Sequence, residues 1–167
     1  MKNPKNCRGI TLIELMVIVT IIGIVSTMAF PQFTTTINRL KFKGAARDVV
    51  STMRLARSNA ITHKQPVGVH FDGDLLTMTM FVDIVNPTNG AFESGDSVLT
   101  VDSLSDSFAA ISTSFGATSV VYRPNGTATA TGTVNMVNYV DNDGINIGTI
   151  EVLASTGRTK VGGLHFY

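Results

Sequence analysis

The sequence contains no tryptophan and a single cysteine, Cys7. One cysteine can form no intramolecular disulfide, so the chain is not a disulfide-stabilised scaffold and has no cysteine metal site. Aromatic residues are scarce at 7%, whereas Gly, Ser, Thr and Asn are frequent in the second half of the chain. This composition favours β-strands joined by turns over a helical bundle. At 167 residues, the chain has room for one domain with a modest core and one long additional element.

The net charge of +1 hides a strong asymmetry along the chain. The stretch 39–64 has one acid, Asp48, against seven bases: Arg39, Lys41, Lys43, Arg47, Arg54, Arg57 and Lys64. After Lys64, three bases face ten acids. The pattern predicts a basic rod and an acidic head. Complementary subunit surfaces or a solvated helix face are the favoured explanation, and a polyanion-binding stripe is the alternative.

The first thirty residues have the pattern of a membrane-inserted segment. Residues 1–9 contain three bases and no acid, and residues 10–30 are apolar except for Thr, Ser, Gly and one Glu. Twenty-one helical residues span about 30 Å, the thickness of a bilayer core. Bases before this segment and none within it predict that the N-terminus stays in the cytoplasm. A secretory signal would have a shorter apolar run and a far-side cleavage site, so we expect the segment to be retained.

Glu14 is the one charged residue inside this apolar segment. A carboxylate in a membrane costs several kcal/mol, so it usually has a partner and a function. If the chain is cut between Gly9 and Ile10, a new ammonium group appears at Ile10. That ammonium could pair with Glu14 of a neighbouring chain and set the axial register of two apolar helices. An uncleaved signal anchor with an incidental interface glutamate is the alternative.

The run Gly9-Ile10-Thr11-Leu12-Ile13-Glu14-Leu15 resembles the type III signal of type IV pilins and type II secretion pseudopilins. The resemblance implies that a prepilin peptidase removes a leader at residues 1–9, cutting after Gly9, and methylates Ile10. It also implies that Glu14 serves filament assembly and that Pro31 kinks the helix. The chain would then be anchored in the bacterial inner membrane by a single helix, with its head in the periplasm.

Beyond Pro31 the sequence predicts an amphipathic helix and then a β-rich head. The apolar residues of 31–64 recur at spacings of three and four: Phe42, Ala45, Ala46, Val49, Met53, Ala56, Ala60 and Ile61. The helix should end around His63-Lys64, because Pro66 disfavours helical geometry at Gln65. In the head, residues 65–167, strands are expected at 67–71, 75–85, 98–101, 111–115, 120–122, 132–140, 147–154 and 160–166. The predicted fold class is α+β: a long N-terminal helix, membrane-spanning in its first half (10–30), packed on an antiparallel β-sandwich.

Short motifs in the head are similar to those of the GspH/FimT family of minor pilins. They are residues 56–61 (ARSNAI), 65–67 (QPV), 122–127 (YRPNGT) and 157–160 (GRTK). The resemblance implies a structural subunit, not an enzyme: an H-type minor pseudopilin of a type II secretion pseudopilus. Its partners would be other pilin or pseudopilin subunits, the prepilin peptidase and an inner-membrane assembly platform. A FimT-like minor type IV pilin is the second hypothesis, and a major pilin the third.

The FimT-like hypothesis includes DNA uptake, because a basic C-terminal motif in that branch resembles Gly157-Arg158-Thr159-Lys160. Arg158 and Lys160 are therefore candidate phosphate contacts, with a turn carrying two solvated cations as the alternative. No cofactor is expected. The three histidines, His63, His70 and His165, are scattered, so neither a metal site nor a catalytic base is expected.

Overall fold

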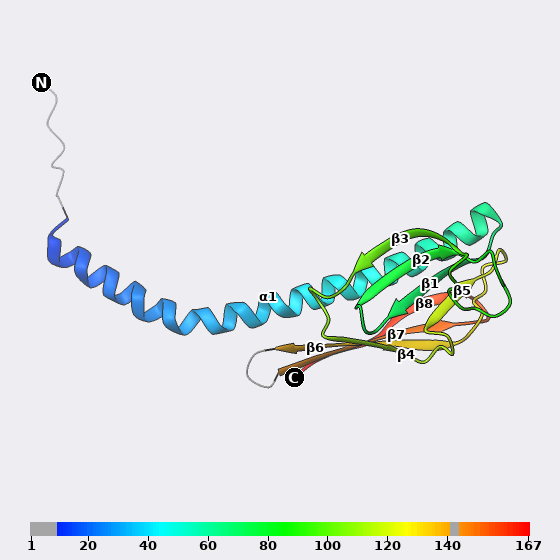
Figure 1. Cartoon of the computed structure of the whole chain (residues 1–167). Helices are drawn as coiled ribbons and strands as arrows, with labels where there is room; N and C mark the ends of the chain where they lie inside the picture. The colour runs from blue at the N-terminus through cyan, green and yellow to red at the C-terminus, as the bar shows by residue number, and fades with distance from the viewer. Residues whose placement is uncertain (1–9, 141–143) are drawn as a thin grey trace, which may run out of the picture. The chain divides into compact units, whose positions relative to one another are not determined.

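The chain divides into two units, Met1–Ile37 and Asn38–Tyr167. The computed structural model describes residues 10–140 and 144–167, but not the side chains of residues 28–32 and 140. The predicted leader, with Gly9, lies outside the described residues. Along the described chain, one long helix is followed by eight strands (Figure 1).

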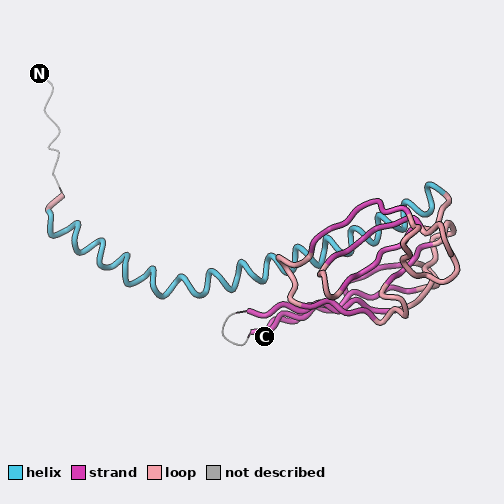
Figure 2. Tube along the Cα trace, viewed as in Figure 1, coloured by secondary structure: helices cyan, strands magenta, loops and turns pink. Residues whose placement is uncertain are grey.

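Helix α1 runs from Leu12 to His63, 52 residues. Figure 2 shows it as one uninterrupted helix. Its end agrees with the predicted one. Lys64 adopts a positive φ of 54°, the left-handed conformation that commonly follows a helix, and Pro66 comes two residues later.

The head consists of two four-stranded antiparallel sheets. Sheet A has the order β3-β2-β1-β5, and sheet B has the order β4-β6-β7-β8. The strands are β1 (Val67–Asp72), β2 (Thr77–Val82), β3 (Ser97–Ser103), β4 (Ala110–Thr113), β5 (Ser119–Tyr122), β6 (Gly132–Val140), β7 (Gly144–Leu153) and β8 (Arg158–Phe166). The predicted combination of a long helix and an antiparallel β head is confirmed.

Strand β2 is shorter at both ends than the predicted strand 75–85, for local hydrogen-bonding reasons. The turn after β1 extends past Leu75, because Asp72 Oδ1 accepts the backbone N–H groups of Asp74 and Leu75 at 2.9 and 2.8 Å. The sequence pattern predicts that this strand reaches residue 85, but β2 ends at Val82. Beyond Val82, the backbone N–H groups of Ile84 and Val85 donate to the carboxylate of Asp96 at 3.0 and 3.2 Å, and not to a neighbouring strand.

The core joins the inner faces of both sheets to one stripe of α1. The buried helix residues are Phe42, Ala46, Val49, Val50, Met53, Ala56 and Ala60. Phe42 contacts Phe108 and Phe166 edge-on, with ring centroids 5.3 and 6.2 Å apart. The predicted stripe is therefore confirmed except at Ala45, which is half-buried at the margin of the core, and at Ile61, which is 44% exposed near the end of the helix.

Candidate functional site

The first candidate site is the start of α1. Thr11 immediately precedes the helix, and its hydroxyl accepts the backbone N–H of Glu14 at 3.3 Å. The Thr11 carbonyl accepts the N–H of Leu15 at 3.2 Å. The Thr-x-x-Glu spacing is that of a capping box, and the hydroxyl of Thr11 supplies the cap at the start of the helix.

Every described side chain from Ile10 to Thr27 is exposed in the isolated chain. The polar ones are satisfied within the helix, because Thr20, Ser26 and Thr27 donate to helix carbonyls at 2.7–2.8 Å. Glu14 is thus left as the one ionisable group on this apolar surface. Among the residues that the structure describes, no helix is long and apolar enough to cross a membrane. The assignment of residues 10–30 as a span stays a prediction.

The assignment of Pro31 as a helix kink is not tested. The position lies within α1, and its side chain is not among those described. The cleavage assignment at Gly9 lies outside the described residues, whereas Ile10, next to it, is 70% exposed. Ile10 is accessible in the isolated chain, and its role in methylation stays a prediction.

The second candidate site is a junction in the head where α1 meets two turns. Arg57 Nε donates to the carbonyl oxygen of Gly126 at 2.9 Å. Gly157, in the turn between β7 and β8, adopts a φ of +59°, and any Cβ there would collide with the Gly126 carbonyl. This junction therefore explains the motifs around Arg57, Gly126 and Gly157. Arg57 forms a hydrogen bond with the turn that contains Gly126, and the missing side chain of Gly157 allows the second turn to pack closely against the first.

Tyr122 lies in the core and contacts Thr159, two residues after Gly157 of the junction. Its side chain is fully buried, and its hydroxyl lies 3.0 Å from Thr159 Oγ1. Burial raises the pKa of Tyr122 to about 12, although the hydrogen bond with Thr159 and the charge of Arg57 act in the opposite direction. The phenol is therefore neutral at physiological pH and serves the packing of the head.

A basic cavity of about 530 Å³ opens beside this junction. Its lining includes Arg54, Arg57 and Arg158 together with Thr156, Gly157 and Thr159. Lys160 does not line it, and its Nζ lies 2.8 Å from Glu151 Oε2 in an ion pair. The structure thus places Arg158 with two helix arginines, and not with Lys160. Sequence reasoning missed this grouping, although Arg54 and Arg57 are three residues apart, the spacing that puts two side chains on one helix face.

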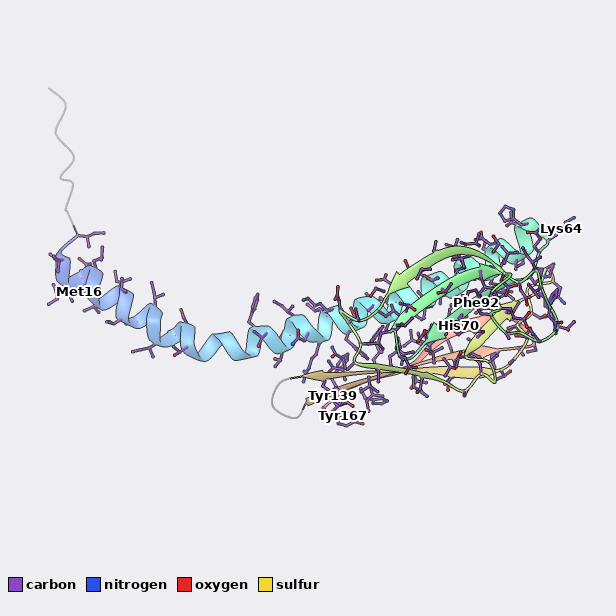
Figure 3. The ribbon with its side chains drawn as sticks, in the orientation of Figure 1. Met16, Lys64, His70, Phe92, Tyr139 and Tyr167 are labelled. Atoms are coloured by element: carbon purple, nitrogen blue, oxygen red, sulfur yellow. The ribbon has the colours of Figure 1, made fainter. Side chains whose placement is uncertain are left out.

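The three histidines do not converge. His63 lies at the end of α1, His70 in β1 and His165 in β8. His70 Nδ1 lies 2.9 Å from Ser119 Oγ, and its ring lies 5.3 Å from that of Phe92 (Figure 3). Burial is the largest influence on His70 and lowers its pKa, against the opposing charge of Asp72. Within the described ranges, no group of three or more His, Cys, Asp or Glu side chains could hold a metal ion.

An acidic loop follows β2. Asp83 is 3% exposed, and its Oδ2 has no hydrogen-bond partner among the described residues. Burial, followed by the charge of Asp96, raises the pKa of Asp83. Desolvation acts in the same direction on Asp96, but the backbone N–H groups of Glu93, Ile84 and Val85 outweigh it and lower the pKa of Asp96. Asp96 holds this loop in place, whereas the charge of Asp83 is unfavourable in the fold.

Comparison with known proteins places this chain in a family. The family model described as type II transport protein GspH matches residues 45–156, and the model of the prokaryotic N-terminal methylation motif matches residues 4–30. No curated protein was found to match the sequence.

Two solved structures share the fold. The minor pseudopilin EpsH of the Vibrio cholerae type 2 secretion system superposes with a TM-score of 0.54 at 14% identity, over 72% of this chain and 95% of that one. The type IV minor pilin FimU of Pseudomonas aeruginosa gives a TM-score of 0.50 at 17% identity, over 72% and 92%.

The long helix, the β head and the N-terminal methylation motif together define a protein with the pilin-like fold. The chain belongs to the GspH family. Pilin and pseudopilin families consist of structural subunits that associate with other subunits of their kind.

Proposed function

We propose that this chain is an H-type minor pseudopilin of a type II secretion pseudopilus. The observation that carries the proposal is the GspH family match over most of the head, together with the methylation motif at the N-terminus. Prepilin peptidase cuts after Gly9 and methylates Ile10. The product is a helix with an apolar first half and a folded head.

Assembly depends on one ion pair between subunits. Glu14 is the single charged residue between Arg8 and Arg39. In a bilayer, its carboxylate and the new ammonium at Ile10 would each carry a large desolvation cost, which the two groups offset by pairing across neighbouring chains. Because apolar helices slide past each other without a polar marker, the pair also fixes their register.

The charges of the leader set the orientation. Lys2, Lys5 and Arg8 precede the apolar segment and hold the N-terminus in the cytoplasm, so the head lies in the periplasm. Subunits leave the inner membrane through the assembly platform and join a periplasmic fibre, which a cytoplasmic ATPase extends. The extending fibre drives folded cargo through an outer-membrane channel.

Deletion of the gene tests this function. We expect the deletion to stop release of folded type II substrates into the medium, and the wild-type chain to restore it. Glu14→Ala should not restore release although it reaches the membrane, whereas Ser26→Ala, a matched change on the same apolar helix, should. Normal secretion in the deletion strain, with impaired pilus formation or DNA uptake, would move the protein to the alternative function.

A FimT-like minor pilin that binds DNA is the second candidate. The observation that favours it is the basic cavity, where Arg54, Arg57 and Arg158 lie together and could contact phosphates. Arg158→Ala should weaken salt-sensitive DNA retardation by the full chain, and Lys160→Ala should weaken it less because Lys160 is paired with Glu151. Absence of retardation by the wild-type chain at low salt would remove this candidate.

A further inference from the structure

Strand β3 is an edge strand with an unusual degree of exposure. It lies at the edge of sheet A and pairs with β2 on one side only (Figure 1). All seven of its residues are exposed. Three of them are large and apolar: Val98, Leu99 and Val101, at 48, 45 and 59% exposure. Natural proteins usually protect such an edge with lysine, proline or a covering element. Strand β3 contains no lysine and no proline.

The hydrogen-bonding groups on the free edge of β3 can be assigned from its pairing. Leu104 N–H donates to the Leu76 carbonyl at 2.8 Å, so Leu104 faces β2. In an antiparallel pair the inward and outward positions alternate, so Thr100 and Asp102 also face β2. The backbone N–H and carbonyl groups of Val101 and Ser103 therefore point away from the sheet. This outer edge is available to pair with another strand.

A cavity lies beside the same strand. It has a volume of about 250 Å³, and its lining consists of Asn59, His63, Gln65, Val67, Val82 and Leu99. Leu99 lies in β3 at the register shift with β2, where it has no paired residue, and its side chain forms part of the cavity wall. Strand addition generally combines backbone hydrogen bonds, which supply affinity, with side-chain pockets, which supply specificity. Both elements are present here.

The charge around this edge selects the chemistry of the partner. Between Lys64 and Arg123 the chain has no lysine or arginine, and it has seven acids: Asp72, Asp74, Asp83, Glu93, Asp96, Asp102 and Asp106. All four strands of sheet A lie within this stretch. Asp96 immediately precedes β3, Asp102 lies within it and Asp106 follows it, so a peptide that pairs with β3 meets acids and no lysine or arginine along the strand. This charge favours lysine and arginine in the peptide and disfavours acids.

We propose that the outer edge of β3 is a strand-addition site for an extended, basic segment of a partner protein. The segment pairs with the backbone of Val101 and Ser103 and places an apolar side chain in the cavity beside Leu99. This site is separate from Ile10 and Glu14, so it can fail without affecting the proposed processing and assembly.

The test uses the full chain in detergent micelles and a fluorescent seven-residue peptide of alternating lysine and valine, the length of β3. Val101→Pro removes an outward N–H group and leaves the pairing with β2 intact, since proline is tolerated on an outer edge. We expect this variant to bind the peptide about tenfold more weakly than the wild type. Val101→Thr keeps the N–H group and should bind as the wild type does.

Two peptide controls separate strand addition from general charge attraction. A lysine–valine peptide with N-methylated central amides keeps its charge but cannot pair, and a glutamate–valine peptide can pair but carries the wrong charge. Both should bind weakly. The proposal is overturned if the lysine–valine peptide does not bind the wild-type chain, if Val101→Pro binds it equally well, or if N-methylation makes no difference. Circular dichroism should show the same secondary structure in both Val101 variants.

Discussion

The two ends of α1 have opposite relations to solvent. From Ile10 to Thr27 every described side chain is exposed, although most are apolar. From Phe42 to Ala60 most apolar side chains form one buried stripe against the head, whereas Leu55, at 51% exposure, and the charged residues lie outside it. The segment from Phe42 to Ala60 has the amphipathic pattern of a helix packed on a soluble domain. The apolar side chains from Ile10 to Thr27 are not packed against any described part of the isolated chain. One continuous helix therefore combines an apolar segment that is exposed in the isolated chain with a segment whose apolar stripe is buried in the head.

The largest expected effect comes from the one charge in the first segment. Glu14→Ala should reduce incorporation of the chain into fibres by about a hundredfold, because the ammonium of a neighbouring Ile10 would be left unpaired in a low dielectric. Co-sedimentation with sheared fibres measures it. The thermal stability of the head should not change. Normal incorporation would show that assembly does not depend on an ion pair at Glu14.

A matched pair of methionines compares the two segments directly. Met53 is fully buried in the head core, and Met16 is 60% exposed in the first segment. Met53→Ala should lower the free energy of unfolding of the head by about 3 kcal/mol, through lost burial and a cavity. Met16→Ala should have no effect on it. Thermal unfolding in detergent measures both, and equal losses would mean that the first segment also contributes to the core.

A substitution at Arg57 measures how much its hydrogen bond to Gly126 stabilises the packing of residues 42–60 of α1 on the head. Arg57→Ala removes the hydrogen bond to the Gly126 carbonyl and should cost about 1.5–3 kcal/mol of unfolding free energy, the range for a charged donor. Arg54→Ala is the control, because its contact with the Thr159 carbonyl is long, at 3.4 Å. A larger loss at Arg54 would contradict this role of Arg57.

The smallest effect concerns the acidic loop and depends on pH. The pKa of Asp83 is raised in the fold, so as pH increases the unfolded chain ionises first and the free energy of unfolding falls until the folded carboxyl also ionises. Asp83→Asn removes this loss. The variant should be more stable than the wild type at neutral pH, and the difference should vanish below the ordinary aspartate pKa of 3.8. A constant difference across that range would rule out ionisation as the cause.

The sequence was sufficient for features that depend on local patterns. The spacing of Phe42, Val49 and Met53 predicted the buried helix face, and Pro66 predicted the helix end. Both signals are contained in a few neighbouring residues, so no tertiary information was needed.

Features that depend on tertiary contacts were not predicted. Arg57, Gly126 and Gly157 meet from three distant segments, and no local pattern indicates that a helix arginine will bond to a turn. The early end of β2 has the same origin, because Asp96 binds the backbone of residues that a strand pattern assigns to β2. The grouping of Arg158 with Arg54 and Arg57 became visible only when the hairpin was placed beside α1.

The central claim is that the apolar first segment is exposed at a new N-terminus and assembled into a fibre. Intact-mass analysis of the protein from membranes of cells with and without prepilin peptidase tests it most directly. With the peptidase, we predict a chain from Ile10 to Tyr167 carrying one methyl group, and without it the full-length chain. Full-length protein in both strains would contradict the account, because residues 10–30 would then be a plain signal anchor.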